Sequence, residues 1–249
     1  MFGPITASLW TTNFVVMVAL LYLLLRRRLW REIPVFVALI AVSVLCSAVL
    51  QLLAGLDFRW GYYYGVWFSR AIEGLLGLAV IHEVLRKVLL RFDALRSLAH
   101  SAFWIAIIIL LGAAVASEAT MPDQDWPHAL TRALAGIERA MLLLSAGLMV
   151  LMFVLVAICG MPWRRLIFGV ALGLGIYAAA KLALVTTYSY LGMEWFGWYT
   201  VALMVTGILQ SAIWVTYVGI PEREPESAPQ LVQFTLERWN NALLEVLQR

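Results

Sequence analysis

Seven long apolar stretches constrain this chain more than any other feature of its sequence. They are Ala7–Leu25, Ile33–Ala54, Tyr62–Ile81, Leu98–Ser117, Ala133–Cys159, Leu166–Leu191 and Trp198–Ile220. An α-helix rises about 1.5 Å per residue, so roughly 20 apolar residues cross the ~30 Å hydrocarbon core of a bilayer. Barrel strands would be shorter and would alternate in polarity. The sequence therefore predicts an all-α bundle of seven transmembrane helices, in keeping with a composition that is 63% hydrophobic and 13% charged.

Basic residues gather on one predicted side of this bundle. They follow the first, third and fifth stretches and recur in the tail: Arg26, Arg27, Arg28, Arg31, Arg86, Lys87, Arg91, Arg96, Arg164, Arg165, Arg223, Arg238 and Arg249. Arg59 and Arg132 fall on the opposite side, among a larger number of acidic residues. Because cytoplasmic loops carry the excess of Lys and Arg, we expect the N-terminus outside and the C-terminus inside. The net charge of +3 suits anionic lipids and requires no nucleic-acid partner.

Prolines divide the chain into a transmembrane domain, residues 1–220, and a cytoplasmic tail, residues 221–249. Pro221, Pro225 and Pro229 mark a short, semi-rigid linker. Beyond it, an amphipathic helix is predicted whose apolar stripe is formed by Val232, Leu236, Trp239 and Leu243. This stripe must be buried, either against the bundle or the membrane interface, or against a protein partner or second copy.

Three charges inside the predicted membrane spans form the candidate site. Arg70 and Glu73 share a face of the third stretch and are expected to pair, which leaves Lys181 of the sixth stretch unmatched. Three outcomes stay open. Lys181 snorkels to the outer headgroups, or it joins Glu73 in a cluster with a neighbour such as Tyr177, or the cluster receives an anionic ligand, a small acidic molecule or lipid headgroup.

Other polar residues are weaker candidates for a functional site. The apolar run of the fifth stretch begins at Ala140, so Glu138 and Arg139 are expected at the outer interface. His82 and His100 fall at similar depth, but interfacial histidines are commonplace, and no haem, metal or other cofactor is predicted. The chain lacks the sequence signatures of metal, serine-hydrolase and phosphate-binding sites, so we do not expect an enzyme.

Small residues recur in the sixth stretch, where Gly169 and Gly173 stand four positions apart. This spacing lets two helix backbones approach closely. Packing inside the bundle is the favoured interpretation, and a homodimer interface is the alternative.

Two segments carry a resemblance to known proteins. The first runs from Tyr62-Tyr-Tyr-Gly-Val-Trp-Phe-Ser-Arg-Ala-Ile-Glu-Gly through Val80-Ile-His-Glu-Val-Leu-Arg, and the second is Leu236-Glu-Arg-Trp-Asn-Asn-Ala-Leu in the tail. Both resemble a group of uncharacterised bacterial seven-helix proteins. The topology is similar to that of the seven-helix sensors of some bacterial histidine kinases. The resemblance implies a multi-pass protein of the bacterial inner membrane whose signal passes to a separate protein. Rhodopsins carry a lysine in their last helix, whereas Trp198–Ile220 has none, so retinal is not expected.

These features favour a non-enzymatic sensor or scaffold that couples an outer or intramembrane event to a cytoplasmic partner. An accessory subunit of a larger membrane complex is the alternative. A transporter or channel is less favoured, because no proline interrupts the middle of a span, and transporters often build their sites from broken helices.

Overall fold

A computed structural model describes residues 3–56, 58–88, 140–150, 152–154, 165–191 and 195–220, and the single positions 101, 104, 105, 108, 112, 136 and 138. Its elements are α1 (Gly3–Arg26), η1 (Leu29–Arg31), α2 (Pro34–Gly55), α3 (Arg59–Val88), α6 (Arg165–Leu191) and α7 (Phe196–Gly219). A shorter apolar helix covers Ala140–Val154. The described residues contain no strand, which confirms the all-helical prediction for this part of the chain.

Five of these helices are long and apolar enough to cross a membrane: Ile5–Arg26, Pro34–Gly55, Trp60–Lys87, Arg165–Thr187 and Phe196–Gly219. They coincide with the first, second, third, sixth and seventh predicted stretches. The protein is therefore a multi-pass membrane protein by the length and composition of its helices. Most of the predicted span Leu98–Ser117 and the whole tail, with its predicted stripe, lie outside the described residues.

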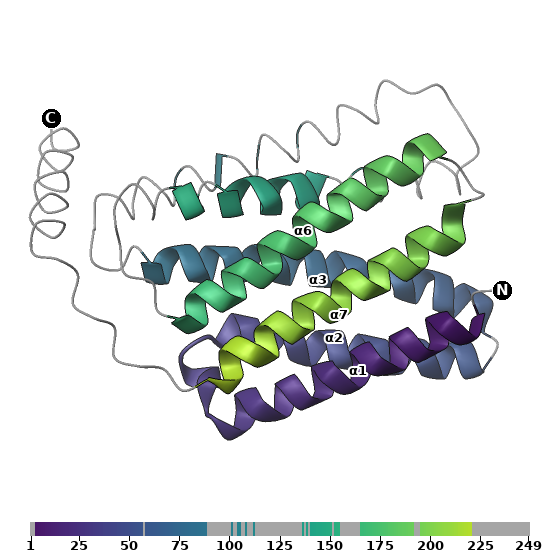
Figure 1. The fold of residues 1–249 in the computed structure, drawn as a ribbon, viewed down its shortest axis with the longest axis horizontal. Helices are drawn as coiled ribbons and strands as arrows, with labels where there is room; N and C mark the ends of the chain where they lie inside the picture. Colours follow the sequence, from purple (N-terminus) through teal and green to yellow (C-terminus); the bar gives the residue numbers. More distant parts are fainter. Residues whose placement is uncertain are drawn as a thin grey trace, which may run out of the picture.

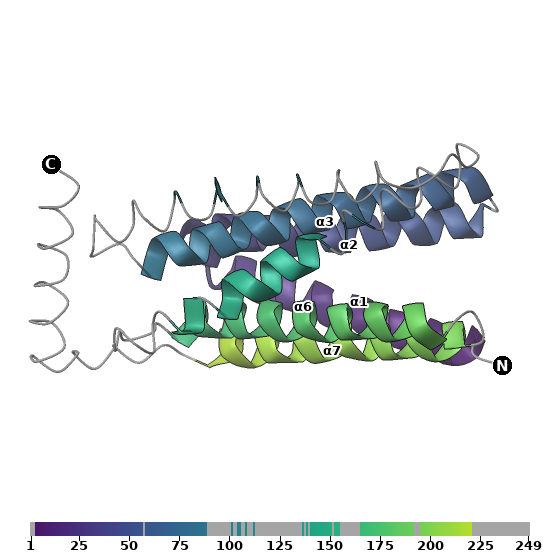
Figure 2. The ribbon, with the colours of Figure 1, turned by 90° about the horizontal axis from the view of Figure 1, so that it is seen from above.

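The helices form two layers. One layer contains α1, α7 and α6, with α7 in the middle, and the other contains α2 packed on α3 (Figures 1 and 2). The short helix Ala140–Val154 lies between α3 and α6. On the α3 side, a Cβ atom built on Gly74 falls 2.8 Å from the sulfur of Met141. On the other side, Gly175 of α6 faces Met149. The layers are thus joined through this helix.

Among the described residues, most of the buried apolar side chains lie toward one end of the bundle, which we call the core end. There α1, α3 and α7 finish while α2 and α6 begin (Figure 1). The largest fully buried side chains include Leu24, Phe36, Val84 and Val170, each from the core-end half of its helix. Trp214 completes this cluster, with its ring edge-on to Phe36 at 5.0 Å and its indole N–H donating to the carbonyl of Val170 at 3.3 Å.

Charged side chains satisfy helix termini at the core end. The buried carboxylate of Glu83 accepts the backbone N–H of Phe36, in the first turn of α2, at 3.4 Å, and the ammonium of Lys87 at 3.1 Å. Arg27 donates to the carbonyl of Gly219, the last residue of α7, at 2.7 Å. Helix ends carry backbone groups without intrahelical partners. These contacts therefore tie α3 to α2 and α1 to α7.

The two glycines of the Gly-x-x-x-Gly motif face α7. A Cβ atom on Gly169 would collide with the ring of Tyr217, and one on Gly173 would collide with the ring of Trp214. The glycines therefore let two aromatic rings of α7 lie against the α6 backbone. Packing inside the bundle is confirmed at these positions, and the homodimer alternative is wrong there, because α7 already occupies the face.

Much of the outer surface of the described helices is apolar. Leu45, Leu52 and Phe68 are each more than 60% exposed, and the aromatic rings at the start of α3 are exposed as well, with Trp60 at 72%. Soluble monomers rarely present contiguous apolar patches of this extent. Aromatic residues at a helix end also suit the headgroup region, so this surface is the one that faces lipid.

The packing at Gly173 gives a stability test. We expect Gly173→Ala to lower the free energy of unfolding by about 1–3 kcal/mol, because the buried Trp214 ring has no room to retreat. Gly77→Ala is the matched control, since its Cβ meets nothing within 4 Å and alanine favours helix by up to about 1 kcal/mol. Thermal unfolding in detergent measures both. Equal midpoints for the two variants would contradict the α6–α7 contact.

Candidate functional site: a charged cavity between the layers

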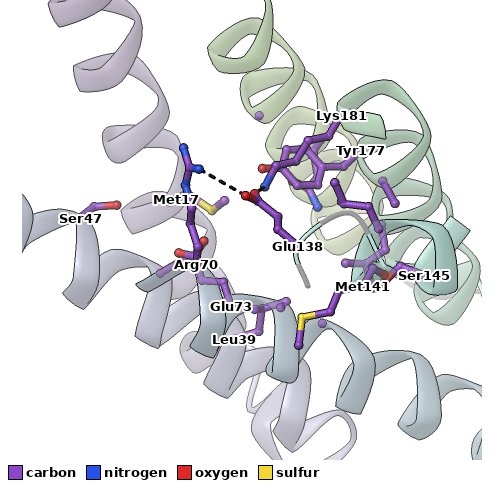
Figure 3. Close-up of a pocket in the computed structure, with 18 of the residues that line it drawn as sticks. Met17, Leu39, Ser47, Arg70, Glu73, Glu138, Met141, Ser145, Tyr177 and Lys181 are labelled. Atoms are coloured by element: carbon purple, nitrogen blue, oxygen red, sulfur yellow. Dashed lines mark hydrogen bonds and ion pairs between the residues drawn. The ribbon is translucent and has the colours of Figure 1, made fainter. Parts of the chain in front are cut away.

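A cavity of about 310 Å³ lies between the two layers, with the core as its floor (Figure 3). Side chains from α1, α2, α3, α6 and α7 and from residues 138–145 line it. Four of these side chains carry charge and are called here the charge cluster: Arg70, Glu73, Glu138 and Lys181. Tyr177 lines the cavity as well, so all four residues of the predicted site face one space.

Glu138 is the centre of the charge cluster. Its Oε2 lies 3.3 Å from Nη1 of Arg70, and its Oε1 lies 2.7 Å from Nζ of Lys181 (Figure 3). The Lys181 ammonium approaches Oε1 off the hydrogen-bonding direction, so this contact is an ion pair rather than an aligned hydrogen bond. The side chains of Lys181 and Glu138 are only 12% and 19% exposed. Poor solvent screening strengthens such pairs.

Aromatic rings flank both cations. The guanidinium carbon of Arg70 lies 5.5 Å from the ring centroid of Trp67, and the ammonium of Lys181 lies 5.6 Å from that of Tyr177. Cations within about 6 Å of an aromatic face are attracted by the quadrupole of the ring. The rings therefore hold both cations beside the cavity.

Glu73 takes a partner from another helix. Its side chain hydrogen-bonds to Ser43 of α2, and Lys181 and Arg70 are near enough to attract it electrostatically. The ion pair of Arg70 is made with Glu138, so the expected intrahelical pair of Arg70 with Glu73 is not formed among the described contacts. A carboxylate on a neighbouring helix reaches the guanidinium, while the serine holds Glu73 in place.

Two further expectations are corrected here. Lys181 does not snorkel to the headgroups but turns inward to Glu138. Glu138 itself is not a solvated interfacial residue, as the start of the apolar run at Ala140 had indicated, because it lies between two cations from different helices. A boundary drawn from hydropathy along one helix takes no account of such partners across the bundle.

The charge cluster is balanced. Arg70 and Lys181 contribute two positive charges, and Glu73 and Glu138 offer two carboxylates. The unmatched positive charge on which the anionic-ligand prediction rested is thus offset by Glu138. Recognition of a ligand in this cavity therefore depends on the shape of the site and on its remaining hydrogen-bonding groups.

The cavity changes character along its length. At the charged end it also presents Ser47, while amides and hydroxyls occupy its middle, including Asn13 and the buried Gln210. The floor is apolar and is formed by Leu39, Ile81, Leu174 and Trp214. The site therefore combines a polar head region with an apolar base, the arrangement expected for a pocket that binds small molecules.

Several lining residues were missed by the sequence analysis. Asn13 of α1 accepts a hydrogen bond from the hydroxyl of Ser211 of α7 at 3.1 Å, and Gln210 lies beside that serine. Each amide interrupts an otherwise apolar span. That is the signal by which they could have been found, because polar groups within a membrane span turn toward the bundle interior.

Comparison of this chain with protein families, with curated proteins and with solved structures finds no match. What the fold and the site define is a multi-pass helical membrane protein with a charged cavity inside its bundle.

The pair formed by Lys181 and Glu138 can be tested by a double-mutant cycle. Glu138→Met or Lys181→Met alone leaves an enclosed charge with less compensation, and we expect each to cost up to about 3 kcal/mol of unfolding free energy. The double variant Glu138→Met/Lys181→Met removes both charges and should cost less than the sum of the two. Thermal unfolding of the purified proteins measures the cycle, and strictly additive losses would contradict the pairing.

Proposed function

We propose that this protein is a non-enzymatic, receptor-like membrane protein. A small molecule binds in the intramembrane cavity, and the cytoplasmic tail passes the binding event to a protein partner. One observation carries the proposal, namely a cavity of about 310 Å³ between the helices that brings together four charged side chains. Embedded charges are costly and are usually functional, and pockets of this size hold small ligands.

The proposed topology has seven spans, with the N-terminus outside, in a bacterial inner membrane. α3 ends and α6 begins at the same end of the bundle, so the segment between them crosses the membrane an even number of times (Figure 1). The two predicted spans Leu98–Ser117 and Ala133–Cys159 satisfy this condition. With this orientation, the charged end of the cavity belongs to the outer half of the bilayer, and the core end faces the cytoplasm.

α7 is the proposed coupling element. It lines the cavity through Gly207, Gln210 and Trp214, and the chain continues directly from its end into the tail. A ligand that shifts α7 would therefore move the tail, whose predicted docking stripe is Val232, Leu236, Trp239 and Leu243. The tight core below the cavity argues against a pore that runs through the described helices.

A pair of glycines provides the test of this function. Gly77 lines the cavity and has nothing within 4 Å of a built Cβ, so Gly77→Leu fills the cavity without a backbone clash. Gly147, on the exposed face of its helix, is equally open and does not line the cavity, so Gly147→Leu is the matched control. Native mass spectrometry of the protein purified in its own lipids identifies what each variant retains.

We expect the wild type and Gly147→Leu to retain a small molecule that Gly77→Leu loses. Recovery of the tail partner should change with ligand occupancy in the same order. Retention of the same molecule by Gly77→Leu would place the ligand elsewhere. A stoichiometric protein, with no small molecule in any variant, would instead support the accessory-subunit alternative.

A further inference from the structure

Within the part of the chain that the structure describes, one cation and one carboxylate of the charge cluster retain unused hydrogen-bonding capacity. We propose that the cavity binds a zwitterion that carries a primary ammonium and a carboxylate on an apolar body, that is, an α-amino acid with an apolar side chain. Arg70 receives the carboxylate and Glu73 receives the ammonium. This inference rests on the proposed function and narrows its ligand class.

Arg70 is the available donor. Among the described residues it makes one ion pair, through Nη1, with Glu138, and its side chain is 37% exposed, the most open of the paired charges at the site. A guanidinium carries five N–H donors in a planar fork that matches a carboxylate bidentately. Lys181 is enclosed at 12% exposure and is turned to Glu138. The free donors of the cluster are therefore concentrated on Arg70.

Glu73 is the available acceptor. Ser43 supplies its side-chain hydrogen bond, whereas an ionised carboxylate offers about four acceptor positions. Both oxygens of Glu138 are already in contact with cations. A ligand ammonium that entered the cavity would find its carboxylate partner in Glu73.

The spacing of Arg70 and Glu73 suits one small ligand. Both residues are on α3, three positions apart, and both line the cavity (Figure 3). Side chains at this separation lie on one helix face, with Cβ atoms about 5–6 Å apart. Opposite charges at that spacing match the adjacent ammonium and carboxylate of an amino acid.

Charge balance also favours a zwitterion. Among the described residues the cluster holds two cations and two carboxylates, so an anion or a cation alone would leave a net charge beside the poorly exposed Lys181 and Glu138. Uncompensated buried charge is strongly unfavourable. A zwitterion pairs with both signs and adds no net charge.

The apolar floor accounts for the rest of the ligand. Leu39, Leu174 and Trp214 surround the base of the cavity, and Gly77 leaves space there because it has no side chain. An aliphatic or aromatic side chain would fill this space. A volume of about 310 Å³ is at the small end for ligand pockets, so it favours a free amino acid over a two-chain lipid with the same zwitterionic chemistry in its headgroup.

The test uses the full chain in nanodiscs of phosphatidylglycerol, a lipid without an amine. Isothermal titration compares phenylalanine with N-acetylphenylalanine, which lacks the ammonium, and with phenethylamine, which lacks the carboxylate. We expect phenylalanine or leucine to bind, and each phenylalanine analogue to bind about tenfold more weakly or worse, because each forfeits a charged hydrogen bond. These comparisons need no variant of the protein.

Variants then assign each contact. Glu73→Gln should weaken phenylalanine binding at least tenfold but should change the binding of N-acetylphenylalanine little. Arg70→Gln should likewise weaken phenylalanine binding at least tenfold but should change the binding of phenethylamine little. Glu32→Gln and Arg86→Gln remove the same charges from exposed positions outside the cavity and should change nothing. Thermal unfolding confirms that each variant is folded.

Equal binding of all three compounds, or no binding of any apolar amino acid, would overturn the proposal. So would binding of phosphatidylethanolamine from mixed nanodiscs without binding of an amino acid, because the zwitterion would then be a lipid headgroup. If a different class of small molecule is retained by the wild type and lost by Gly77→Leu, the zwitterion assignment fails while the proposed receptor function stands.

Discussion

The contact of Glu138 with two cations is the interaction on which the arrangement of the cavity depends. Arg70 comes from α3 in one layer and Lys181 from α6 in the other, and the carboxylate lies between them. α3 and α6 make little direct contact, so the helix that carries Glu138 separates them and also joins them. In a bilayer, apolar side chains gain little by leaving lipid for protein, so ion pairs and close packing must hold helices together. Here the pairs leave a polar space open, because none of the charged groups can turn to lipid without losing its partners.

The two ends of the bundle differ in how closely their helices pack. At the core end, close packing and capped helix termini fix α1, α2, α3 and α7 relative to one another. The glycines of α6 add to this by admitting the rings of Trp214 and Tyr217. Beyond the core, the cavity lies between the two layers of helices. The proposed receptor function uses both a closely packed end and an end with a cavity, and α7 belongs to both regions.

Sequence pattern predicted the parts of this structure that depend on one helix at a time. Continuous apolar runs predicted five membrane-spanning helices that the structure describes, and Gly169 with Gly173 predicted a close helix contact. Partners across helices were not predictable in this way. Arg70 and Glu73 share a helix face, yet each takes its partner from another helix. Hydropathy along one helix predicts the wrong environment for Glu138, because it carries no information about cations on other helices. Which carboxylate reaches which cation is decided by the packing of α3 and α6 around the helix between them, and hydrophobic periodicity does not encode that register.

The most direct measurement is disulfide formation between α6 and the helix that follows Glu138. A Cβ atom on Gly175 lies 3.5 Å from the Cβ of Met149, within the range for a disulfide. In a chain with Cys46→Ala and Cys159→Ala, the pair Met149→Cys/Gly175→Cys should form an intramolecular disulfide under mild oxidation, because this helix packs against α6. The pair Gly147→Cys/Gly175→Cys should not, since a Cβ on Gly147 meets nothing within 4 Å. Cross-linking of the second pair in place of the first would contradict the placement of Glu138 between Arg70 and Lys181.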